Sequence, residues 1–454
     1  VTMSTNSSTH ENASTQPLAP RPNRSSGSVA ASTDIRKRQV AIGVGHFMEW
    51  FDFAVYGYFA AIIGAQFFPS GDSVAEMLSA LAVFAVGFVA RPFGALILGP
   101  IGDKYGRKLV LVITVMGMGL TTTAIGLIPN YDTIGVAGPV LIVILRCLQG
   151  IMVGGEWSGA ATYLGESAPS NRRAEYASLI TVTAGAAFLT GTLLAYFLNL
   201  WMDAESLELW GWRIPFVLSF VMAILALFIR RNLEDTPVYE ELQQRRAENP
   251  DMKVATREEK LSAFGLALAF CSVFGVSLYY FVTYANNHLA TIVGMDRPTA
   301  LLACSIGIIV YVLAQPVVGR WSDRHGRRPV LLGGTLYLAV FAIPIFLLLN
   351  TGEFWPVLLG LIILALGVAP VAVMNVTLLV EVFPASVRST GAALGHSVAY
   401  AVLAGPGPLI AGWLIQVTDS QVSPAYYLLA VCTIAFLVLV RYLPETRGKD
   451  ITEG

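Results

Sequence analysis

Charged side chains are scarce in this sequence. Asp, Glu, Lys and Arg together make up 13% of its 454 residues, whereas hydrophobic residues make up 55%. Soluble domains usually carry about 25% charged residues. The formal net charge is −1, so the chain lacks the basic balance with which proteins bind nucleic acids. These shortages exclude an ordinary soluble domain and argue against a nucleic-acid partner.

Cysteines and nucleotide-binding motifs are also few. The four cysteines, Cys147, Cys271, Cys304 and Cys432, lie in apolar segments without paired spacing. We interpret them as small buried hydrophobic residues rather than disulfide partners or metal ligands. No Walker loop is present, which argues against ATP as an energy source. The longest polar segment between apolar ones, residues 232–261, is too short for a catalytic domain. We therefore expect no enzyme activity, no cofactor and no metal.

Long apolar segments are what the sequence contains instead. Twelve of them approach the length of about 20 residues that a membrane-spanning helix needs. They cover residues 39–68, 77–101, 109–128, 139–163, 176–201, 213–231, 262–288, 299–319, 329–350, 355–380, 390–415 and 424–441. The pattern predicts an all-α polytopic protein of the lipid bilayer, with twelve transmembrane helices in two pseudo-symmetric six-helix bundles.

Polar segments divide the chain into two halves. Residues 1–35 contain too few large apolar side chains to build a core, so we expect a disordered tail. The predicted organisation is this N-terminal tail, a first bundle over 36–231, a linker over 232–261, a second bundle over 262–443 and a C-terminal tail over 444–454. Of the 29 Lys and Arg residues, 25 fall on one side of the membrane in this arrangement. The positive-inside rule makes that side cytoplasmic, with both termini there. The expected location is a bacterial inner membrane.

Repeated peptides relate the two halves. GPIGDKYGRK begins at Gly99 and GRWSDRHGRR at Gly319, and both fit G-x3-D-x2-G-R-[KR]. ESAPSNRR from Glu166 and EVFPASVR from Glu381 form a second pair. Parallel repeats of this kind are typical of transporters built from two halves. Charges that pair at the ends of helices must separate when the halves move, so we predict a conformational switch here. Its residues are Gly99, Asp103, Gly106, Arg107, Asp323, Gly326, Arg327, Glu166, Glu381 and Arg388.

The first decapeptide resembles the loop motif of the major facilitator superfamily, and RCLQG from Arg146 resembles a second motif of that superfamily. MEWFDFAVYG from Met48, GGEWSGA from Gly154, GWRIPF from Gly211 and YYFVTY from Tyr279 resemble its metabolite:proton symporter family. The resemblance implies a secondary active transporter that works by alternating access and proton symport. Members of that family carry organic acids or zwitterionic osmolytes such as proline and betaine.

Polar residues interrupt the first apolar segment. One face of its helix carries His46, Glu49, Asp52 and Tyr56. Charge within the membrane is costly unless it faces the protein interior or a water-filled path. We therefore predict that Glu49, Asp52 or Glu156 carries the proton, and the sequence does not choose among the three. A static salt bridge between helices is the alternative, above all for Glu49 with Arg91.

Two arginines within the spans favour an acidic substrate. Arg91 and Arg146 lie at depths that match Glu49 and Asp52, at a helical rise of about 1.5 Å per residue, and a guanidinium fork suits a carboxylate. Some osmolyte carriers of the resembled family carry a long C-terminal coiled coil, which does not follow Pro444 here. Symport of a small organic acid is thus the main expectation, and a zwitterionic osmolyte importer or a transporter-like sensor are the alternatives. The predicted substrate-binding residues are Arg146, Arg91, His46, Tyr56, Gln149, Tyr280, Asn286, Asn375 and His396.

Overall fold

The computed structural model describes residues 43–105, 107–168, 170–231, 256–384 and 387–449. Every regular element within these residues is a helix, as the hydropathy pattern predicted. The expectations for the N-terminal tail and for most of the linker lie outside the described residues.

The first half begins with a helix over residues 43–58, which α2 (Ala60–Phe67) continues after one residue. The other elements of this half are α3 (Ser73–Val89), α4 (Arg91–Tyr105), α5 (Arg107–Leu127), α6 (Tyr131–Ile134), α7 (Ala137–Ser167), η1 (Ser170–Arg172), α8 (Arg173–Trp201), α9 (Ala204–Leu209), η2 (Gly211–Arg213) and α10 (Ile214–Arg231). Capping residues set some of these boundaries. Asp72 caps α3 because its side chain accepts a hydrogen bond from the backbone N–H of Val74 at 2.9 Å.

The second half starts at α12 (Arg257–Tyr279), where Thr256 and Glu259 form a capping box. Its other α-helices are α13 (Ala285–Asn287), α14 (Arg297–His325), α15 (Arg327–Leu349), α16 (Phe354–Glu381), α17 (Arg388–Ala399), α18 (Gly407–Thr418) and α19 (Pro424–Tyr442). Wider, π-helical turns interrupt two of the long helices, at η3 (Tyr280–Tyr284), η4 (His288–Ile292) and η5 (Tyr400–Ala404). Such turns are rare and often mark functional sites.

Ten helices in the described residues are long and apolar enough to cross a membrane. Two of the twelve predicted segments look different from the rest. The segment 39–68 is the helix over 43–58 followed by α2, and the segment 109–128 contains the shorter apolar helix Val112–Leu127.

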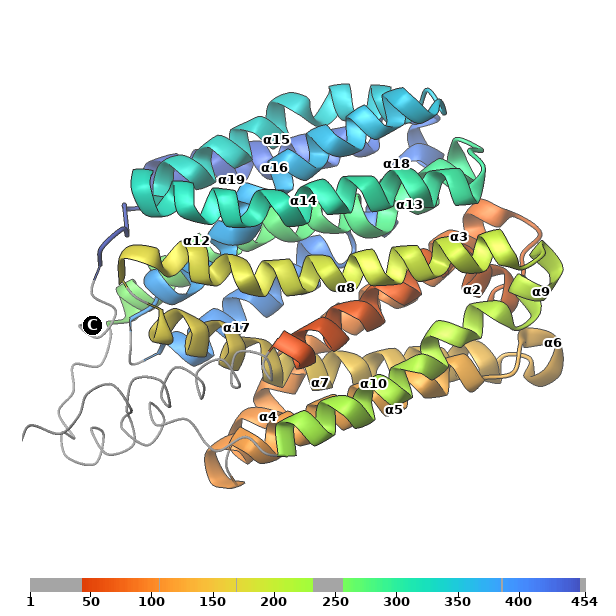
Figure 1. The fold of residues 1–454 in the computed structure, drawn as a ribbon, viewed down its shortest axis with the longest axis horizontal. Coiled ribbons are helices and arrows are strands. Elements are labelled where there is room, and N and C mark those ends of the chain that lie inside the picture. The colour runs from red at the N-terminus through yellow and green to blue at the C-terminus, as the bar shows by residue number, and fades with distance from the viewer. Residues whose placement is uncertain (1–42, 106, 169, 232–255, 385–386, 450–454) are drawn as a thin grey trace, which may run out of the picture. The chain divides into compact units, whose positions relative to one another are not determined.

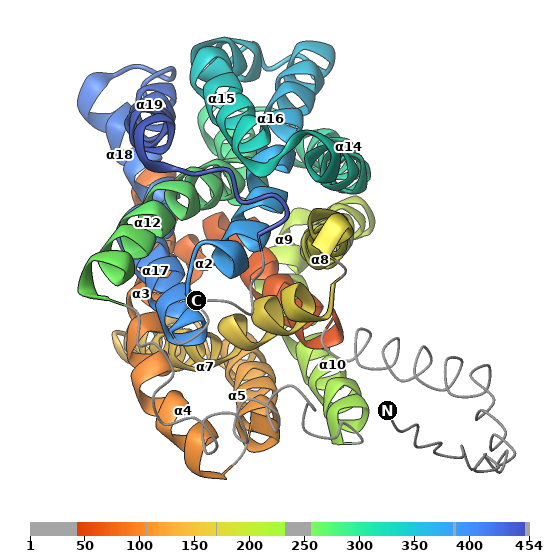
Figure 2. The same cartoon turned by 90° about the vertical axis from the view of Figure 1, so that its left-hand side faces the viewer.

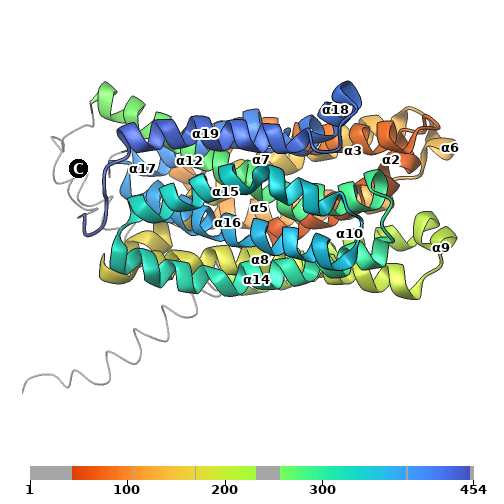
Figure 3. The same cartoon turned by 90° about the horizontal axis from the view of Figure 1, so that it is seen from above.

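The two halves pack against each other along several helices. α8 of the first half runs beside α14 of the second (Figures 1 and 3). A glycine allows this close approach, because a Cβ atom on Gly319 would lie 2.8 Å from the carbonyl oxygen of Ala174. Elsewhere α17 lies against α4 and α7 (Figure 2).

Glycines also bring α3, α4 and α7 together within the first half. A Cβ atom on Gly150 would collide with the carbonyl oxygen of Gly87, and one on Gly94 would collide with that of Ile151. The close crossing lets long side chains from these helices meet in the core, where Arg91 and Arg146 are each 1% exposed.

Candidate functional site

The polar face of the first helix points into the protein. His46, Glu49, Asp52 and Tyr56 are all buried, with exposed fractions of 5%, 3%, 2% and 0%. The predicted stripe therefore faces neighbouring helices rather than lipid, which is the arrangement that a charge within a membrane requires.

Asp52 lies at one end of a hydrogen-bonded chain. Its Oδ1 accepts from the Ser219 hydroxyl and its Oδ2 from the Thr122 hydroxyl, both at 2.7 Å. Thr122 accepts in turn from Gln149 Nε2 at 2.6 Å, and Gln149 Oε1 accepts from Arg146 Nη1 at 3.0 Å. We expected Asp52 and Arg146 to pair directly, but two polar side chains connect them instead. Four helices of the first half supply the side chains of this hydrogen-bonded chain. Membrane depth estimated from sequence position could not reveal these contacts.

Arg146 also lies on an aromatic ring. Its guanidinium carbon is 3.5 Å from the ring centroid of Tyr56, whose hydroxyl donates to the carbonyl of Ala80 at 3.1 Å. Such a cation–π contact stabilises a buried guanidinium without neutralising its charge. Tyr56 thus contacts Arg146 in this structure.

Arg91 is the second buried arginine. Its Nη2 lies 3.9 Å from Glu49 Oε1, which places the two expected partners next to each other at an ion-pair distance too long for a hydrogen bond. Its guanidinium carbon lies 4.4 Å from the ring centroid of Phe88 and 4.8 Å from that of Phe53. Arg91 therefore lies next to both aromatic ring faces and a carboxylate.

Three of the other predicted substrate residues contact neighbouring side chains or backbone. Nε2 of His46 accepts from Trp50 at 2.9 Å, while its Nδ1 lies 3.2 Å from the Thr183 hydroxyl. The Tyr280 hydroxyl donates to the carbonyl of Pro424 at 3.2 Å. His396 stacks on Tyr400, with ring centroids 4.0 Å apart.

Two predicted amides differ from these. Asn286 and Asn375 are 1% and 0% exposed. Among the described residues, Asn286 Oδ1 and both amide atoms of Asn375 find no hydrogen-bond partner. A polar ligand could satisfy these amide atoms.

A charged cluster, which we call the clamp, joins the halves at one end of the helices. Glu381, at the end of α16, accepts from Arg173 of α8 at 3.1 Å and lies 3.3 Å from Arg327 of α15. Arg327 also pairs with Asp323 at 2.7 Å. All four side chains are at most 7% exposed, so the clamp is a buried network of four charges, of which Arg173 alone comes from the first half.

The start of α8 and the C-terminal segment complete the clamp. Asp323 accepts from the backbone N–H groups of Ala174 and Glu175 at 3.1 and 2.9 Å. Glu445 accepts from the N–H groups of Arg327 and Arg328 at 2.8 and 3.1 Å. Burial raises the pKa of Glu445, but these and other backbone N–H groups outweigh it and leave the pKa below its usual range.

The repeat predicted the clamp only in part. Asp323, Arg327 and Glu381 were expected there, with Gly326 at the turn between α14 and α15, where its φ is +107°. Arg388 donates to the carbonyl of Phe383 at 3.4 Å. In the first half, Gly99 lies within α4. Gly106 and the side chains of Asp103, Arg107, Glu156 and Glu166 lie outside what the structure describes.

Sequence reasoning missed several residues at both sites. Arg173 could have been found, because it occupies the position in ESAPSNRR that Arg388 occupies in EVFPASVR. Thr122 and Ser219 carried no signal, since single hydroxyls in apolar segments commonly bond to their own helix backbone. Tyr400 was indistinguishable from the core aromatics until its neighbours were known.

Helices that can cross a membrane, charges buried between them and halves joined by a clamp define a multi-pass membrane transporter. The family comparison agrees. Residues 38–265 match the model of sugar and other transporters, and residues 265–453 match the model of the major facilitator superfamily. The chain belongs to the major facilitator superfamily, which confirms the resemblance that its motifs indicated.

Similar proteins include bacterial osmolyte transporters. The proline/betaine transporter of Escherichia coli K12 is 35% identical over 430 residues, covering 92% of this chain and 85% of its own length. The glycine betaine/proline/ectoine/pipecolic acid transporter of Dickeya dadantii is 32% identical, with the same coverage. Among solved structures, the partially occluded inward-open xylose transporter from E. coli has a TM-score of 0.71 at 20% identity, covering 92% of this chain and 100% of its own. That likeness confirms the fold.

The expected organic-acid substrate is wrong, because relatives at 32–35% identity are named as transporters of proline and betaine. Arginine recognises a carboxylate, and a zwitterion carries a carboxylate too, so the two arginines do not distinguish an organic acid from a zwitterion. Both arginines also lie against aromatic rings, which a bare acid does not need.

Proposed function

We propose that this chain imports a zwitterionic osmolyte of the proline and betaine type by proton symport. The substrate class is supported by the named relatives, which align with 92% of the chain. It is supported independently by buried arginines that lie beside aromatic rings, since such a substrate combines a carboxylate with a cationic nitrogen.

Asp52 is the proposed proton carrier, and its chain of hydrogen bonds to Arg146 is the observation that carries this proposal. Both of its oxygens accept from hydroxyl groups, which can donate or accept in turn. A change of charge at Asp52 can therefore reach Arg146 through Thr122 and Gln149 by rearrangement of these bonds. Glu49, beside Arg91, is the second candidate.

We further propose that bundles over 36–231 and 262–443 alternate around this core, with the linker 232–261 and both termini on the cytoplasmic side. The distribution of Lys and Arg supports that orientation. In it the clamp lies at the cytoplasmic end, and its charges must separate before the site can open there.

Uptake into proteoliposomes tests the coupling. Labelled proline, betaine, 2-oxoglutarate and citrate are offered with and without an inward proton gradient. We expect proline or betaine to accumulate only with the gradient. Asp52→Asn should abolish this accumulation while leaving exchange of substrate across the membrane intact, because exchange needs no net proton movement.

Glu49→Gln serves as the comparison variant. If it loses accumulation and Asp52→Asn keeps it, the carrier is Glu49 and our assignment is wrong. Accumulation of an acid but of neither zwitterion would overturn the proposed substrate class, and zwitterion uptake that ignores the gradient would overturn proton symport.

A further inference from the structure

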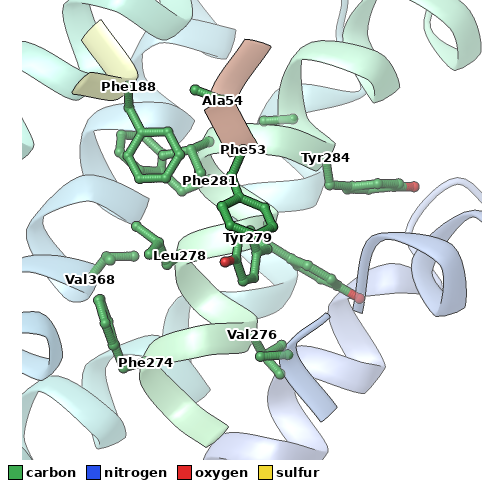
Figure 4. Packing of buried hydrophobic residues seen from close by; sticks show 14 of the residues in the cluster. Phe53, Ala54, Phe188, Phe274, Val276, Leu278, Tyr279, Phe281, Tyr284 and Val368 are labelled. Carbon is green, nitrogen blue, oxygen red and sulfur yellow. The ribbon is translucent and has the colours of Figure 1, made fainter. Parts of the chain in front are cut away.

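Three aromatic rings lie against Arg91 and a fourth packs on two of them, and the four come from both halves. Phe53 and Phe88 have ring centroids 5.0 Å apart, as do Phe88 and Tyr279. Tyr400 lies 5.9 Å from Tyr279 and 6.2 Å from Phe88. The Arg91 guanidinium carbon lies 4.4, 4.8 and 5.6 Å from the rings of Phe88, Phe53 and Tyr400. We call these four rings the cage, and Figure 4 shows Phe53 and Tyr279 within the surrounding core.

The guanidinium at the cage has unused hydrogen-bonding capacity. Arg91 is 1% exposed, and none of its three nitrogens completes a hydrogen bond among the described residues. The Tyr279 hydroxyl likewise completes no hydrogen bond among the described residues, and Glu49 remains 3.9 Å away. Buried donors are normally satisfied in folded proteins. Buried guanidinium donors without a partner among the described residues indicate a ligand that accepts hydrogen bonds.

The cage already holds a cation on its aromatic faces, namely Arg91 itself. Ring faces attract alkylated ammonium groups for the same electrostatic reason. A zwitterion can replace Arg91 on the rings and bind it at the same time. Its cationic end can take the place of the guanidinium on the ring faces, and its carboxylate can accept the guanidinium's hydrogen bonds. A ligand with only a positive charge would be repelled by Arg91. A ligand with only a negative charge could bind the guanidinium but would supply no cation to replace it on the rings.

We propose that the cage and Arg91 form the substrate site, with the carboxylate of the zwitterion on Arg91 and its alkylated ammonium on Phe53, Phe88, Tyr279 and Tyr400. This inference rests on the proposed function and deepens it. Each half supplies two rings, Phe53 and Phe88 from the first and Tyr279 and Tyr400 from the second. The site is therefore complete only while the halves are together, which couples its occupancy to their movement.

Two ligands of equal shape test the cage. Glycine betaine and 3,3-dimethylbutanoate share a carboxylate and differ in that a neutral carbon replaces the quaternary nitrogen. Binding of each to the purified full chain is measured by competition with labelled betaine. We expect Phe88→Leu or Tyr400→Leu to weaken betaine binding by about 2- to 30-fold, the range of one cation–π contact. Binding of 3,3-dimethylbutanoate should change much less, and Tyr400→Phe should preserve betaine binding.

Phe281→Leu is the matched control. Phe281 is a buried core aromatic whose ring packs on Tyr311 at 5.8 Å and makes no cation–π contact with Arg91. It should leave the ratio of betaine to 3,3-dimethylbutanoate affinity unchanged. If the leucine variants do not fold, stepwise fluorination of Phe88 weakens its ring face at nearly constant shape, and betaine affinity should fall with each fluorine.

Arg91→Lys tests the carboxylate contact, and it should weaken both ligands because a lysine cannot present the planar fork. Equal losses for both ligands in the cage variants, or unchanged betaine affinity on fluorination or in Arg91→Lys, would overturn the proposed site. Such results would leave the proposed function standing if the unsubstituted protein still accumulates betaine. A protein that binds and transports no zwitterion would overturn both.

Discussion

Replacing Glu381 by Gln should open the clamp. The Glu381 side chain is fully buried and contacts Arg173 and Arg327, whose side chains are 4% and 0% exposed. Removing one partner of a buried ion pair costs about 3–5 kcal/mol, because it leaves an uncompensated charge behind. In the proposed alternation the clamp forms only while this end is closed, so that cost falls on the closed state. The equilibrium should shift toward opening by about 100-fold or more, at roughly 1.4 kcal/mol per tenfold change.

Pulsed electron paramagnetic resonance measures this opening as a distance between two spin labels. Asn171 and His325 are exposed positions in opposite halves near the clamp. Cysteines introduced there can be labelled after Cys147, the one partly exposed cysteine among the described residues, is replaced by Ala. Glu381→Gln should add a population at longer distances.

Glu175→Gln is the control for this experiment. Glu175 pairs with Arg172 and Arg320 at the same end, but those arginines are 55% and 64% exposed. Exposed pairs contribute about 0–1 kcal/mol, so this variant should move the distribution little. Identical distance distributions for Glu381→Gln and the unsubstituted protein would refute the reasoning, and so would an equal shift in the control.

Three further predictions concern other contacts. The folded-state pKa of Glu445 is lowered, so its contribution to clamp stability is present at neutral pH and is lost as the pH falls below 4.5. The distance between labels at Asn171 and His325 should therefore lengthen in acid, and Glu445→Gln should reduce this dependence on pH. Asn287 donates to the Gly57 carbonyl of the other half at 2.8 Å. Asn287→Ala should shift the equilibrium toward separation of the halves at this contact by about fivefold, as expected for one neutral hydrogen bond. Labels at Ser70 and Thr351 would report that change, and an unaltered distribution would contradict it. A Cβ on Gly150 would collide with the backbone of Gly87, so Gly150→Ala should destabilise the protein by about 1–3 kcal/mol. Gly265→Ala should not, because a Cβ on Gly265 meets open space. Equal melting temperatures of the two variants would contradict this prediction.

The sequence by itself determined the class of this protein. Low charge, long apolar segments and the repeated decapeptide predicted an all-α transporter of two halves, and the family comparison confirmed it. These properties depend on composition and periodicity, which are local, so no knowledge of contacts was needed. The burial of Glu49 and Asp52 followed in the same way from the cost of charge in a membrane.

Tertiary structure alone decided which side chains work together. Depth along the helices suggested that Asp52 meets Arg146, but α5 and α10 place Thr122 and Ser219 on that carboxylate. Gln149 of α7 lies between Thr122 and Arg146. The rings around Arg91 come from positions as distant as Phe53 and Tyr400, and that juxtaposition is absent from any local pattern. An arginine alone indicates a carboxylate. Only the aromatic faces packed beside it add the preference for a cation, because packing between distant helices is a property of the whole fold.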